Sequence, residues 1–431
     1  MAETPRGLVV AAPSSGSGKT LITLGLLRAL RHKGVAVSAA KAGPDYIDPR
    51  FHEAAVGAPC INLDPWAMRP EFIRELASSS TGLFVAEGVM GLFDGTETGE
   101  GSTADLAAHL NLPVVTVMDV QRQAQTVAAV LAGLMNHRKE CRIVGVIFNR
   151  VGTPRHAALL EAAVKPLGIP VLGSIANDRN LEVPSRHLGL VQASEHPQIE
   201  GFLEHAATVV TGSIDLEALC ALAEPIGDAG NVARLQPLGQ RIAIARDQAF
   251  AFAYQHVLDG WQKTGAEILP FSPLADEAPD TSADAIYLPG GYPELHGGKI
   301  AANGNFLKGL RDAAQAGTLI YGECGGYMVL GDGLTDADGA RHQMAGLLKV
   351  ETSFAKRKLH LGYRELKHEN ALPLPSRLRG HEFHYSTLLH QGAGEPLFTA
   401  HDAAGRELGA MGLRRANVMG SYAHIIDIGA V

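Results

Sequence analysis

In the first half of the sequence, the residues that can do chemistry stand in a run of small residues ending in lysine and threonine. An apolar stretch leads into the letters APSSGSGKT (residues 12–20), and a helical pattern follows. In such a loop, backbone N–H groups surround a phosphate at the N-terminus of the next helix, where the helix dipole favours an anion. The lysine can reach the β- and γ-phosphates, and the threonine hydroxyl can bind magnesium. The predicted nucleotide contacts are Ser15, Gly16, Gly18, Lys19 and Thr20.

Two acidic motifs follow strand-like apolar runs in the same half, KAGPDYID (residues 41–48) and EGVMGLFDG (residues 87–95). Magnesium prefers oxygen ligands, and α/β sheets bind ligands at the carboxyl ends of their strands. We therefore expect Asp45 and Glu87 to bind magnesium together with Thr20. The alternative is that these acids only form turns or cap loops. Asn149 ends another strand-like run. It is a candidate contact to the edge of adenine, and the alternative is that it is only a turn residue.

In the second half, a cysteine stands where an apolar run meets a glycine-rich helix start, in TLIYGECGGY (residues 318–327). This pattern is the thiol counterpart of the GxSxG elbow, a sharp turn that exposes a nucleophile. We expect Cys324 to be that nucleophile, with its pKa lowered by the helix N-terminus and by a neighbouring imidazole. The candidate base is His424, in GSYAH (residues 420–424).

Backbone N–H groups in glycine-rich loops can stabilise the oxyanion that forms when a thiol attacks an amide. The Gly325 N–H, next to the cysteine, is one candidate donor. A second loop, LPGGYPE (residues 288–294), follows another strand-like run and contributes Gly290 and Gly291.

Two histidines in GHEFHYS (residues 380–386) are candidate metal ligands, His381 and His384. No cysteine and no third histidine stands near them in the sequence. We therefore do not predict zinc binding in this segment.

The elements that must position these residues follow from the hydrophobic pattern. Strands are expected at residues 7–12, 35–41, 81–87, 112–119, 143–149 and 171–175, and helices at 19–32 and 123–137. Continuous apolar strands separated by helices indicate a parallel sheet covered on both faces.

Residues 225–240 mix proline, glycine, aspartate and asparagine with little periodicity, which is typical of a linker. Strand-like runs then resume at residues 241–245, 285–288, 318–321 and 417–420. The sequence therefore predicts two α/β domains, residues 1–224 and 241–431, joined by the linker 225–240.

Composition narrows the class of protein further. Of the 431 residues, 46% are hydrophobic and 19% are charged, with a formal net charge of −8. This balance supports folded cores and argues against non-specific nucleic-acid binding. The four cysteines form no CxxC motif, and the sequence shows no signal peptide and no apolar run long enough to span a membrane. We expect a cytoplasmic protein with reduced thiols and with neither nucleic-acid nor membrane partners.

Together the motifs resemble the cobyrinic acid a,c-diamide synthase family of cobalamin biosynthesis, over essentially the whole chain. The resemblance rests on the phosphate loop, both acidic motifs, LPGGYPE, GECGG (residues 322–326), GHEFHYS and GSYAH. The first half also resembles dethiobiotin synthetase, and the second half is similar to class I (Triad) glutamine amidotransferases. The implied fold is α/β, with an N-terminal P-loop parallel-sheet domain and a C-terminal class I glutamine amidotransferase domain.

The resemblance implies ATP- and glutamine-dependent amidation of the a and c acetate side chains of cobyrinic or hydrogenobyrinic acid. A substrate carboxylate would take the γ-phosphate of ATP, with Mg²⁺ as cofactor, and form an acyl phosphate. Cys324 would meanwhile release ammonia from glutamine, with His424 moving protons. Class I glutaminases usually carry an acid two residues after this histidine, where the chain has Ile426. A Cys–His pair is therefore implied rather than a full triad.

The corrinoid contacts that the resemblance implies fall in two groups. The first, beside the acidic motifs, is Tyr46, Ile47, Asp48 and Asp94. The second is basic and suited to the carboxylates of the substrate, and consists of Lys356, Arg357, Lys358 and Arg364. The alternative for residues 356–358 is a solvated loop.

Three other functions compete with this one. A cobyric acid synthase-like enzyme or a nickel-tetrapyrrole a,c-diamide synthase would use the same two-domain logic. A nucleotide-gated binding protein with a vestigial glutaminase is the third, and the intact Cys324 and His424 argue against it. The partners expected are ATP, glutamine and a corrinoid polyacid. The metal content of the corrinoid, the order of amidation and a homodimeric state stay open.

Overall fold

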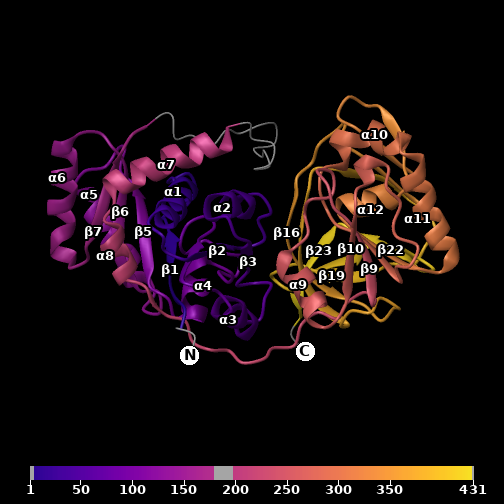
Figure 1. The fold of residues 1–431 in the computed structure, drawn as a ribbon, viewed down its shortest axis with the longest axis horizontal. Helices are drawn as coiled ribbons and strands as arrows, with labels where there is room; N and C mark the ends of the chain where they lie inside the picture. Colours follow the sequence, from indigo (N-terminus) through magenta and orange to yellow (C-terminus); the bar gives the residue numbers. More distant parts are fainter. Residues whose placement is uncertain (1–3, 179–197, 430–431) are drawn as a thin grey trace. The chain divides into compact units, whose positions relative to one another are not determined.

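A computed structural model describes residues 4–178 and 198–429 of the chain. The chain divides into two compact units, Met1–Val232 and Ala233–Val431 (Figure 1). The division falls inside residues 225–240. The start of that segment belongs to the first unit, because the short strand β8 (Glu224–Pro225) pairs with the N-terminal strand β1 (Arg6–Ala11).

The first unit is built on a sheet in the order β3-β2-β4-β1-β5-β6-β7, and all of these strands are parallel. The strands are β1 (Arg6–Ala11), β2 (Val37–Ala42), β3 (Cys60–Leu63), β4 (Leu83–Glu87), β5 (Val114–Asp119), β6 (Ile143–Val151) and β7 (Val171–Ala176). The predicted strands are present. The four-residue β3 was missed, because a short run containing Asn62 gives little apolar signal.

Helices cover both faces of this sheet, as the continuous apolar strands require (Figure 1). They are α1 (Lys19–His32), α2 (Asp48–Val56), α3 (Pro70–Ser78), α4 (Thr103–Leu110), α5 (Thr126–His137), α6 (Pro154–Val164), α7 (Ile199–Ser213) and α8 (Leu216–Ala221). α1 has the predicted bounds and packs against α7 and α2. Its N-terminus holds the phosphate loop against the end of β1.

The second unit contains a sheet in the order β10-β9-β11-β12-β22-β21, parallel except for its last strand. The strands are β9 (Arg241–Ala245), β10 (Glu267–Phe271), β11 (Ala285–Leu288), β12 (Leu319–Glu323), β21 (Leu413–Arg415) and β22 (Val418–Ser421). Its helices are α9 (Gln255–Lys263), α10 (Gly297–Ala302), α11 (Gly304–Ala316) and α12 (Gly325–Leu330). This part has the predicted α/β character, and its predicted strands are present.

Two further sheets of this unit were not predicted. One runs β20-β19-β16-β17-β23 and is antiparallel, and the other runs β14-β13-β15-β18. Their strands are β13 (Gly333–Thr335), β14 (Arg341–Gln343), β15 (Val350–Ser353), β16 (His360–Lys367), β17 (Arg377–His384), β18 (Thr387–Gln391), β19 (Phe398–His401), β20 (Glu407–Met411) and β23 (Ala423–Ile428). Strands such as β16 are half-exposed and carry charged residues, so a search for continuous apolar runs passes over them.

The second unit has a hydrophobic core on each face of its parallel sheet. On one face, β9 and β11 pack with α11 and α12 through residues such as Phe306 and Met328. On the other face, side chains of the same strands meet Leu366, Phe398 and Ile425 of the antiparallel sheet. The layers are therefore helix, parallel sheet and antiparallel sheet.

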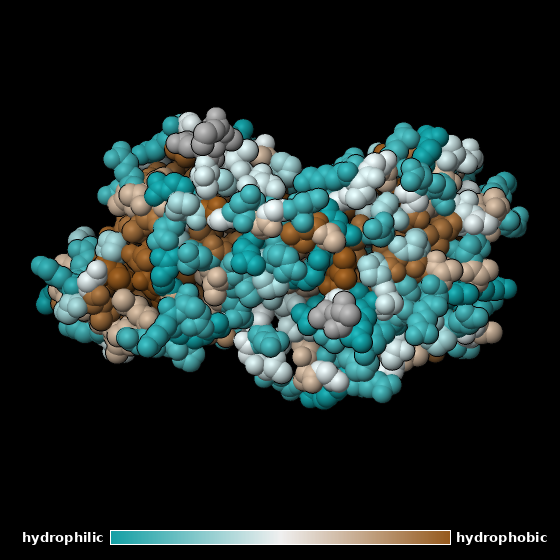
Figure 2. All heavy atoms as spheres, turned by 90° about the horizontal axis from the view of Figure 1, so that it is seen from below, coloured by the Kyte–Doolittle hydropathy of each residue, from teal (hydrophilic) through white to brown (hydrophobic). Residues whose placement is uncertain are grey.

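Hydrophilic residues cover most of the face drawn in Figure 2, and hydrophobic residues show mainly in recesses between them. None of the helices in the described ranges is long and apolar enough to cross a membrane.

The contact between α1 and α7 depends on a glycine. A Cβ at Gly25 would lie 2.5 Å from Val210 Cγ2 and 2.8 Å from the Ala206 carbonyl oxygen. We expect Gly25→Ala to destabilise the first unit by about 1–3 kcal/mol, because the helices must separate. Urea unfolding followed by Trp66 fluorescence in a Trp261→Phe background measures this unit, since the chain has two tryptophans.

The matched control is Gly133→Ala on α5, where an added Cβ meets no atom within 4 Å. That change should stabilise the unit by about 0.5–1 kcal/mol, because alanine has the higher helix propensity. Equal effects of the two substitutions would contradict the close packing of α1 on α7.

Candidate active sites

The phosphate loop joins β1 to α1 and is shaped by glycines with left-handed backbone conformations. Gly16 has φ 77° and Gly18 has φ 90°, and α1 begins at Lys19. A Cβ at Gly18 would lie 2.2 Å from Asn149 Nδ2, so only glycine fits there. The loop borders a cavity of about 410 Å³ lined by Gly16, Gly18, Lys19, Thr20, Leu21, Asn149, Arg150, Ala176, Asn177 and Asp178. Ser15 lies on the exposed side of the loop.

Asn149 lies beneath the loop and also lines the cavity. Its Nδ2 donates to the Ser17 carbonyl oxygen at 2.9 Å. Asn149 therefore positions the phosphate loop, because its side-chain amide links β6 to the loop. Its predicted role as an adenine contact stays a prediction. Arg150, with φ 62°, donates to the Gly16 carbonyl oxygen from the same strand end.

The loop lysine has a defined partner. Lys19 Nζ donates to the Met90 carbonyl oxygen at 2.5 Å. Met90 has φ 50°, a left-handed conformation that costs energy for a side chain other than glycine. Burial lowers the pKa of Lys19, and the Glu87 carboxylate partly opposes that shift.

The centre of the site is the fully buried Glu87 at the end of β4. Its Oε1 accepts from Thr20 Oγ1 at 2.6 Å and lies 2.6 Å from Lys41 Nζ. Its Oε2 lies 2.6 Å from His52 Nε2. Lys41 opens the KAGPDYID motif but was not among the predicted site residues, and His52 lies inside a helix and carries no motif. A buried cation next to a strand-end acid is the signal that could have found them.

Charge compensation sets the titration of this cluster. Burial alone would raise the pKa of Glu87, but Lys41 and His52 outweigh it and hold that pKa below its usual range. Burial would lower the pKa of His52, and the Glu87 carboxylate reverses the shift and raises it to about 10. Lys41 likewise has a raised pKa, since Glu87 and Asp48 outweigh its burial.

The two aspartates of the first acidic motif play different parts. Asp48 Oδ2 lies 2.6 Å from Lys41 Nζ and 3.4 Å from Thr20 Oγ1. Asp45 Oδ1 instead accepts from the backbone N–H groups of Ile47 and Asp48, as a turn-forming acid does. Burial and the neighbouring Asp48 raise the pKa of Asp45 to about 6.

This donor set fits magnesium. Thr20, Asp48 and Glu87 offer hydroxyl and carboxylate oxygens, which Mg²⁺ prefers, at the N-terminus of a phosphate-binding helix. Lys41 Nζ lies 2.6 Å from one oxygen of each carboxylate, so a bound Mg²⁺ would share these carboxylates with the lysine. By geometry Asp48 joins Thr20 and Glu87 more directly than Asp45 does.

The other expected substrate contacts of this unit surround the cluster. Tyr46 is half-buried and Ile47 is buried at the start of α2. Asp94 Oδ2 accepts from the Gly91 N–H at 2.8 Å and shapes the loop that carries Met90.

In the second unit, Cys324 forms the predicted elbow between β12 and α12. Its backbone angles are φ 47° and ψ −103°, and α12 begins at Gly325. A Cβ at Gly326 would lie 2.0 Å from the Leu288 carbonyl oxygen, so the turn requires glycine. The strained backbone of a residue held at a strand–helix turn is typical of a nucleophile elbow.

The expected low pKa of the Cys324 thiol is wrong. Burial and the nearby Glu294 carboxylate hold that pKa above its usual range, although the Gly325 N–H acts in the opposite direction. The thiol lies 3.8 Å from the Phe383 carbonyl oxygen. Burial of Cys324 removes the water that would stabilise a thiolate, and sequence spacing does not report it.

His424 stands on β23, opposite His381 of β17, and is buried. Burial, together with His381 and His384, lowers the pKa of His424 to about 3, so its imidazole is neutral and is a weaker base than an exposed histidine. A Cβ at Gly290 would lie 2.3 Å from His424 Cε1, and a Cβ at Gly325 would lie 3.1 Å from the Gly291 nitrogen. The three predicted oxyanion glycines therefore gather between the elbow and the base.

Glu323 is a buried acid beside His424, and it was not among the predicted site residues. Its Oε2 lies 3.9 Å from His424 Nδ1. Tyr287 donates to Oε2 at 2.7 Å, and the Ile425 N–H donates to Oε1 at 3.1 Å. Burial raises the pKa of Glu323 to about 7. This acid thus precedes the cysteine instead of following the histidine.

The basic residues proposed for the corrinoid separate into two groups. Lys356, Arg357 and Lys358 are exposed in the loop before β16. Arg364 is instead paired with Glu382, with Nε 2.7 Å from Oε2. A third histidine does lie near His384 in space, because pairing of β16 with β17 brings His360 opposite it, and spacing along the sequence did not predict this.

A phosphate-loop unit and a cysteine-elbow unit in one chain define a glutamine-dependent amidating ligase. The family models agree with this division. Residues 8–191 match the CobQ/CobB/MinD/ParA nucleotide binding domain, and residues 241–428 match the CobB/CobQ-like glutamine amidotransferase domain.

Proteins that are similar along nearly the whole chain show which family of amidating ligases this is. The chain is 55% identical to hydrogenobyrinate a,c-diamide synthase of Brucella anthropi, over 98% of each chain. It is 53% identical to the Rhizobium meliloti protein of that name and 49% identical to the Mesorhizobium japonicum one, in both cases over 98% of this chain and 99% of the relative. The chain belongs to the hydrogenobyrinate a,c-diamide synthase family.

The close approach of Gly290 to the base generates one prediction. Gly290→Ala should displace His424, because the added Cβ would overlap its ring. A misplacement of about 1 Å can lower glutaminase turnover by about 100-fold. Release of glutamate from glutamine measures the effect. Gly298→Ala is the control, because its Cβ would lie 3.6 Å from the nearest atom, His342 Cε1. Equal turnover in both variants would contradict the placement of His424 against this loop.

The buried ion pair generates a second prediction. The pKa of His52 is about 10 in the folded chain and about 6.5 when unfolded, so its contribution is complete below pH 6.5 and is lost as pH rises toward 10. His52→Leu should lower the free energy of unfolding by about 3–5 kcal/mol at neutral pH. It should also abolish the decrease in stability between pH 6.5 and pH 10. Urea unfolding followed by Trp66 fluorescence measures both.

His32→Leu provides the control for that experiment. His32 is half-exposed and lies 3.4 Å from Glu204, so its removal should change stability by less than about 1 kcal/mol. A His52 variant as stable as the His32 variant would show that Glu87 does not depend on the imidazolium.

Proposed function

We propose that this enzyme converts the a and c acetate side chains of hydrogenobyrinic acid to amides, using ATP and glutamine. The observation that carries the proposal is the match, at 55% identity over 98% of each chain, to a hydrogenobyrinate a,c-diamide synthase. The phosphate loop and the cysteine elbow supply the two half-reactions that such a synthesis needs.

In the first half-reaction, a substrate carboxylate attacks the γ-phosphorus of ATP, and ADP leaves to give an acyl phosphate. Lys19 and the loop N–H groups hold the transferring phosphate, and Lys41, 2.6 Å from both Asp48 and Glu87, offers a positive charge beside it. Thr20, Asp48 and Glu87 would hold Mg²⁺, with Asp45 nearby, and the ion would offset the charge of the two anions. Ammonia then displaces phosphate and leaves the amide.

In the second half-reaction, Cys324 attacks the side-chain amide of glutamine and passes its proton to the neutral imidazole of His424. The N–H groups of Gly290, Gly291 and Gly325 would stabilise the oxyanion. Collapse of that intermediate returns the proton from His424 to the leaving nitrogen and releases ammonia, and water then hydrolyses the thioester to glutamate. Because the thiol has a raised pKa, proton transfer to His424 accompanies attack instead of preceding it.

Substrate recognition is assigned to residues around each site. Tyr46, Ile47, Asp48 and Asp94 stand beside the phosphate-transfer centre, where they can select which acetate reacts. Lys356, Arg357 and Lys358 carry exposed positive charges suited to a polyacid. Arg364 is the weaker candidate, because Glu382 already neutralises it. We also propose a cytoplasmic location and a homodimer.

Product mass tests the proposal. Purified enzyme with MgATP and glutamine is offered hydrogenobyrinic acid, its cobalt complex cobyrinic acid, and a nickel tetrapyrrole in separate reactions. Two carboxylates converted to amides on hydrogenobyrinic acid, at the a and c positions, support the proposal. Amidation at other positions would favour a cobyric acid synthase-like activity. Amidation of the nickel compound alone would show that the substrate is a nickel tetrapyrrole instead of a corrinoid.

The two half-reactions should separate by mutation. Cys324→Ser should reduce glutamine-dependent synthesis by at least about 100-fold, because a serine hydroxyl is a far weaker nucleophile without its own activation. Synthesis with high ammonium should persist, since ammonia reaches the acyl phosphate directly. The measurement is amide formation with each nitrogen source.

Lys19→Ala is the matched variant of that experiment. It should stop synthesis with both nitrogen sources, because both need the acyl phosphate. Loss of both activities in Cys324→Ser would contradict separate sites, and synthesis retained in Lys19→Ala would refute the assignment of the phosphate loop.

A further inference from the structure

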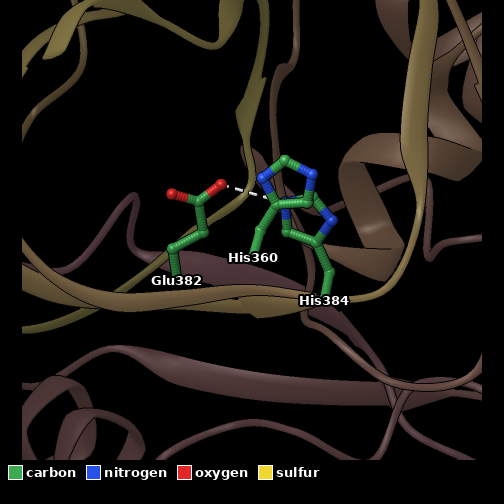
Figure 3. A group of neighbouring side chains, drawn as sticks. All are labelled: His360, Glu382 and His384. Atoms are coloured by element: carbon green, nitrogen blue, oxygen red, sulfur yellow. Dashed lines mark hydrogen bonds and ion pairs between the residues drawn. The ribbon is translucent and has the colours of Figure 1, made fainter. Parts of the chain in front are cut away.

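Three side chains of the metal-binding kind converge on neighbouring strands of the second unit, His360, Glu382 and His384 (Figure 3). Each offers one ligand atom, and these atoms all lie within 4.8 Å of one another. Register explains the convergence. His360 of β16 stands directly opposite His384 of β17, and Glu382 is two residues earlier on β17, so it shares the same face.

Contacts outside the cluster fix the orientation of two of these side chains. His384 Nδ1 lies 3.1 Å from the Ser386 carbonyl oxygen, which leaves Nε2 facing Glu382 Oε1 at 2.9 Å. The other oxygen of Glu382 accepts from Arg364 Nε at 2.7 Å. In metal sites a ligating histidine commonly has its second nitrogen on a carbonyl, and a ligating carboxylate is itself hydrogen-bonded. Both supports are present.

The third side chain has no hydrogen bond at its buried nitrogen. In the described part of the chain, His360 Nε2 is shielded from solvent and has no hydrogen-bond partner. Its ring stacks on His384, with centroids 4.6 Å apart and planes 8° apart. The His360 residue as a whole is half-exposed, so its ring can turn and a small ion can reach the cluster.

We propose that His360, Glu382 and His384 form a binding site for a divalent transition-metal ion, with Zn²⁺ as the best match and water as the fourth ligand. Two imidazoles and one carboxylate are a common zinc ligand set, whereas Mg²⁺ prefers oxygen ligands alone. Zinc ligands lie about 2.0–2.2 Å from the ion. Rotation of His360 about its side-chain bonds closes the remaining gap.

Binding exchanges one cation for another. A proton shared by His384 Nε2 and Glu382 Oε1 leaves to solvent, and the metal takes its place between the two atoms. Arg364 keeps the outer oxygen of Glu382. No oxidation or group transfer accompanies this exchange.

The position of the site beside the glutaminase nucleophile goes beyond the proposed function. Phe383 stands between the two ligands of β17, and its carbonyl oxygen contacts the Cys324 thiol. A bound ion would therefore hold the backbone that borders Cys324. This site is separate from the magnesium site of the first unit, which uses oxygen donors only.

Metal titration of the untagged full-length enzyme tests the site. After removal of metals by a chelator, Zn²⁺ is added in competition with a chromogenic chelator, and Co²⁺ is added to report ligand geometry by visible absorption. The wild type should bind one Zn²⁺ per chain at this site. His360→Ala and Glu382→Gln should each weaken binding by at least about 100-fold, the upper end of the effect of losing a supporting contact.

His390→Ala is the matched control, because His390 is an exposed histidine on β18 outside the cluster. Its binding should equal that of the wild type. His360→Gln keeps the size of the side chain and replaces His360→Ala if that variant does not fold. Binding that is unchanged in the His360 variant, equally weakened in the His390 variant, or absent from the wild type would overturn the site. None of these outcomes bears on amide synthesis, so failure of the metal site is distinct from failure of the proposed function.

Discussion

Each unit depends on the fact that parallel strands end at one edge of their sheet. In the first unit, that edge collects the phosphate loop after β1, Lys41 near the end of β2 and Glu87 at the end of β4. Groups of opposite charge are thereby forced together in a buried place. The site is stable because Lys41 and His52 neutralise Glu87, and a buried carboxylate without such partners would take up a proton. In the second unit, the corresponding edge carries Cys324 after β12 and Gly290 after β11.

The same constraint explains what could be predicted. Strand, loop and helix are consecutive around Lys19 and around Cys324, so local spacing contains the geometry. The bounds of α1 and of β9 agree with the sequence expectation for that reason. Parallel strands are also visible in the sequence as continuous apolar runs. The sheet of the first unit was therefore predictable except for the short β3 and the two-residue β8.

What could not be predicted depends on pairing between distant segments and on burial. His360 meets Glu382 and His384 only because β16 pairs with β17 in one register. Glu323 lies beside His424 through the approach of β12 to the start of β23, about a hundred positions apart in the chain. The titration of the Cys324 thiol follows from loss of water, which spacing does not encode. Side chains that act through such contacts leave no local motif.

The contact between Lys19 and the Met90 carbonyl oxygen has a consequence for where the charge of this lysine is held. An ammonium group has three N–H donors, and the Met90 carbonyl oxygen takes one of them, so a phosphate oxygen can bind without breaking that contact. The carbonyl oxygen belongs to a residue whose backbone is left-handed. A change of backbone conformation at residue 90 would therefore move the charge of Lys19, although the two residues lie 71 positions apart in the chain.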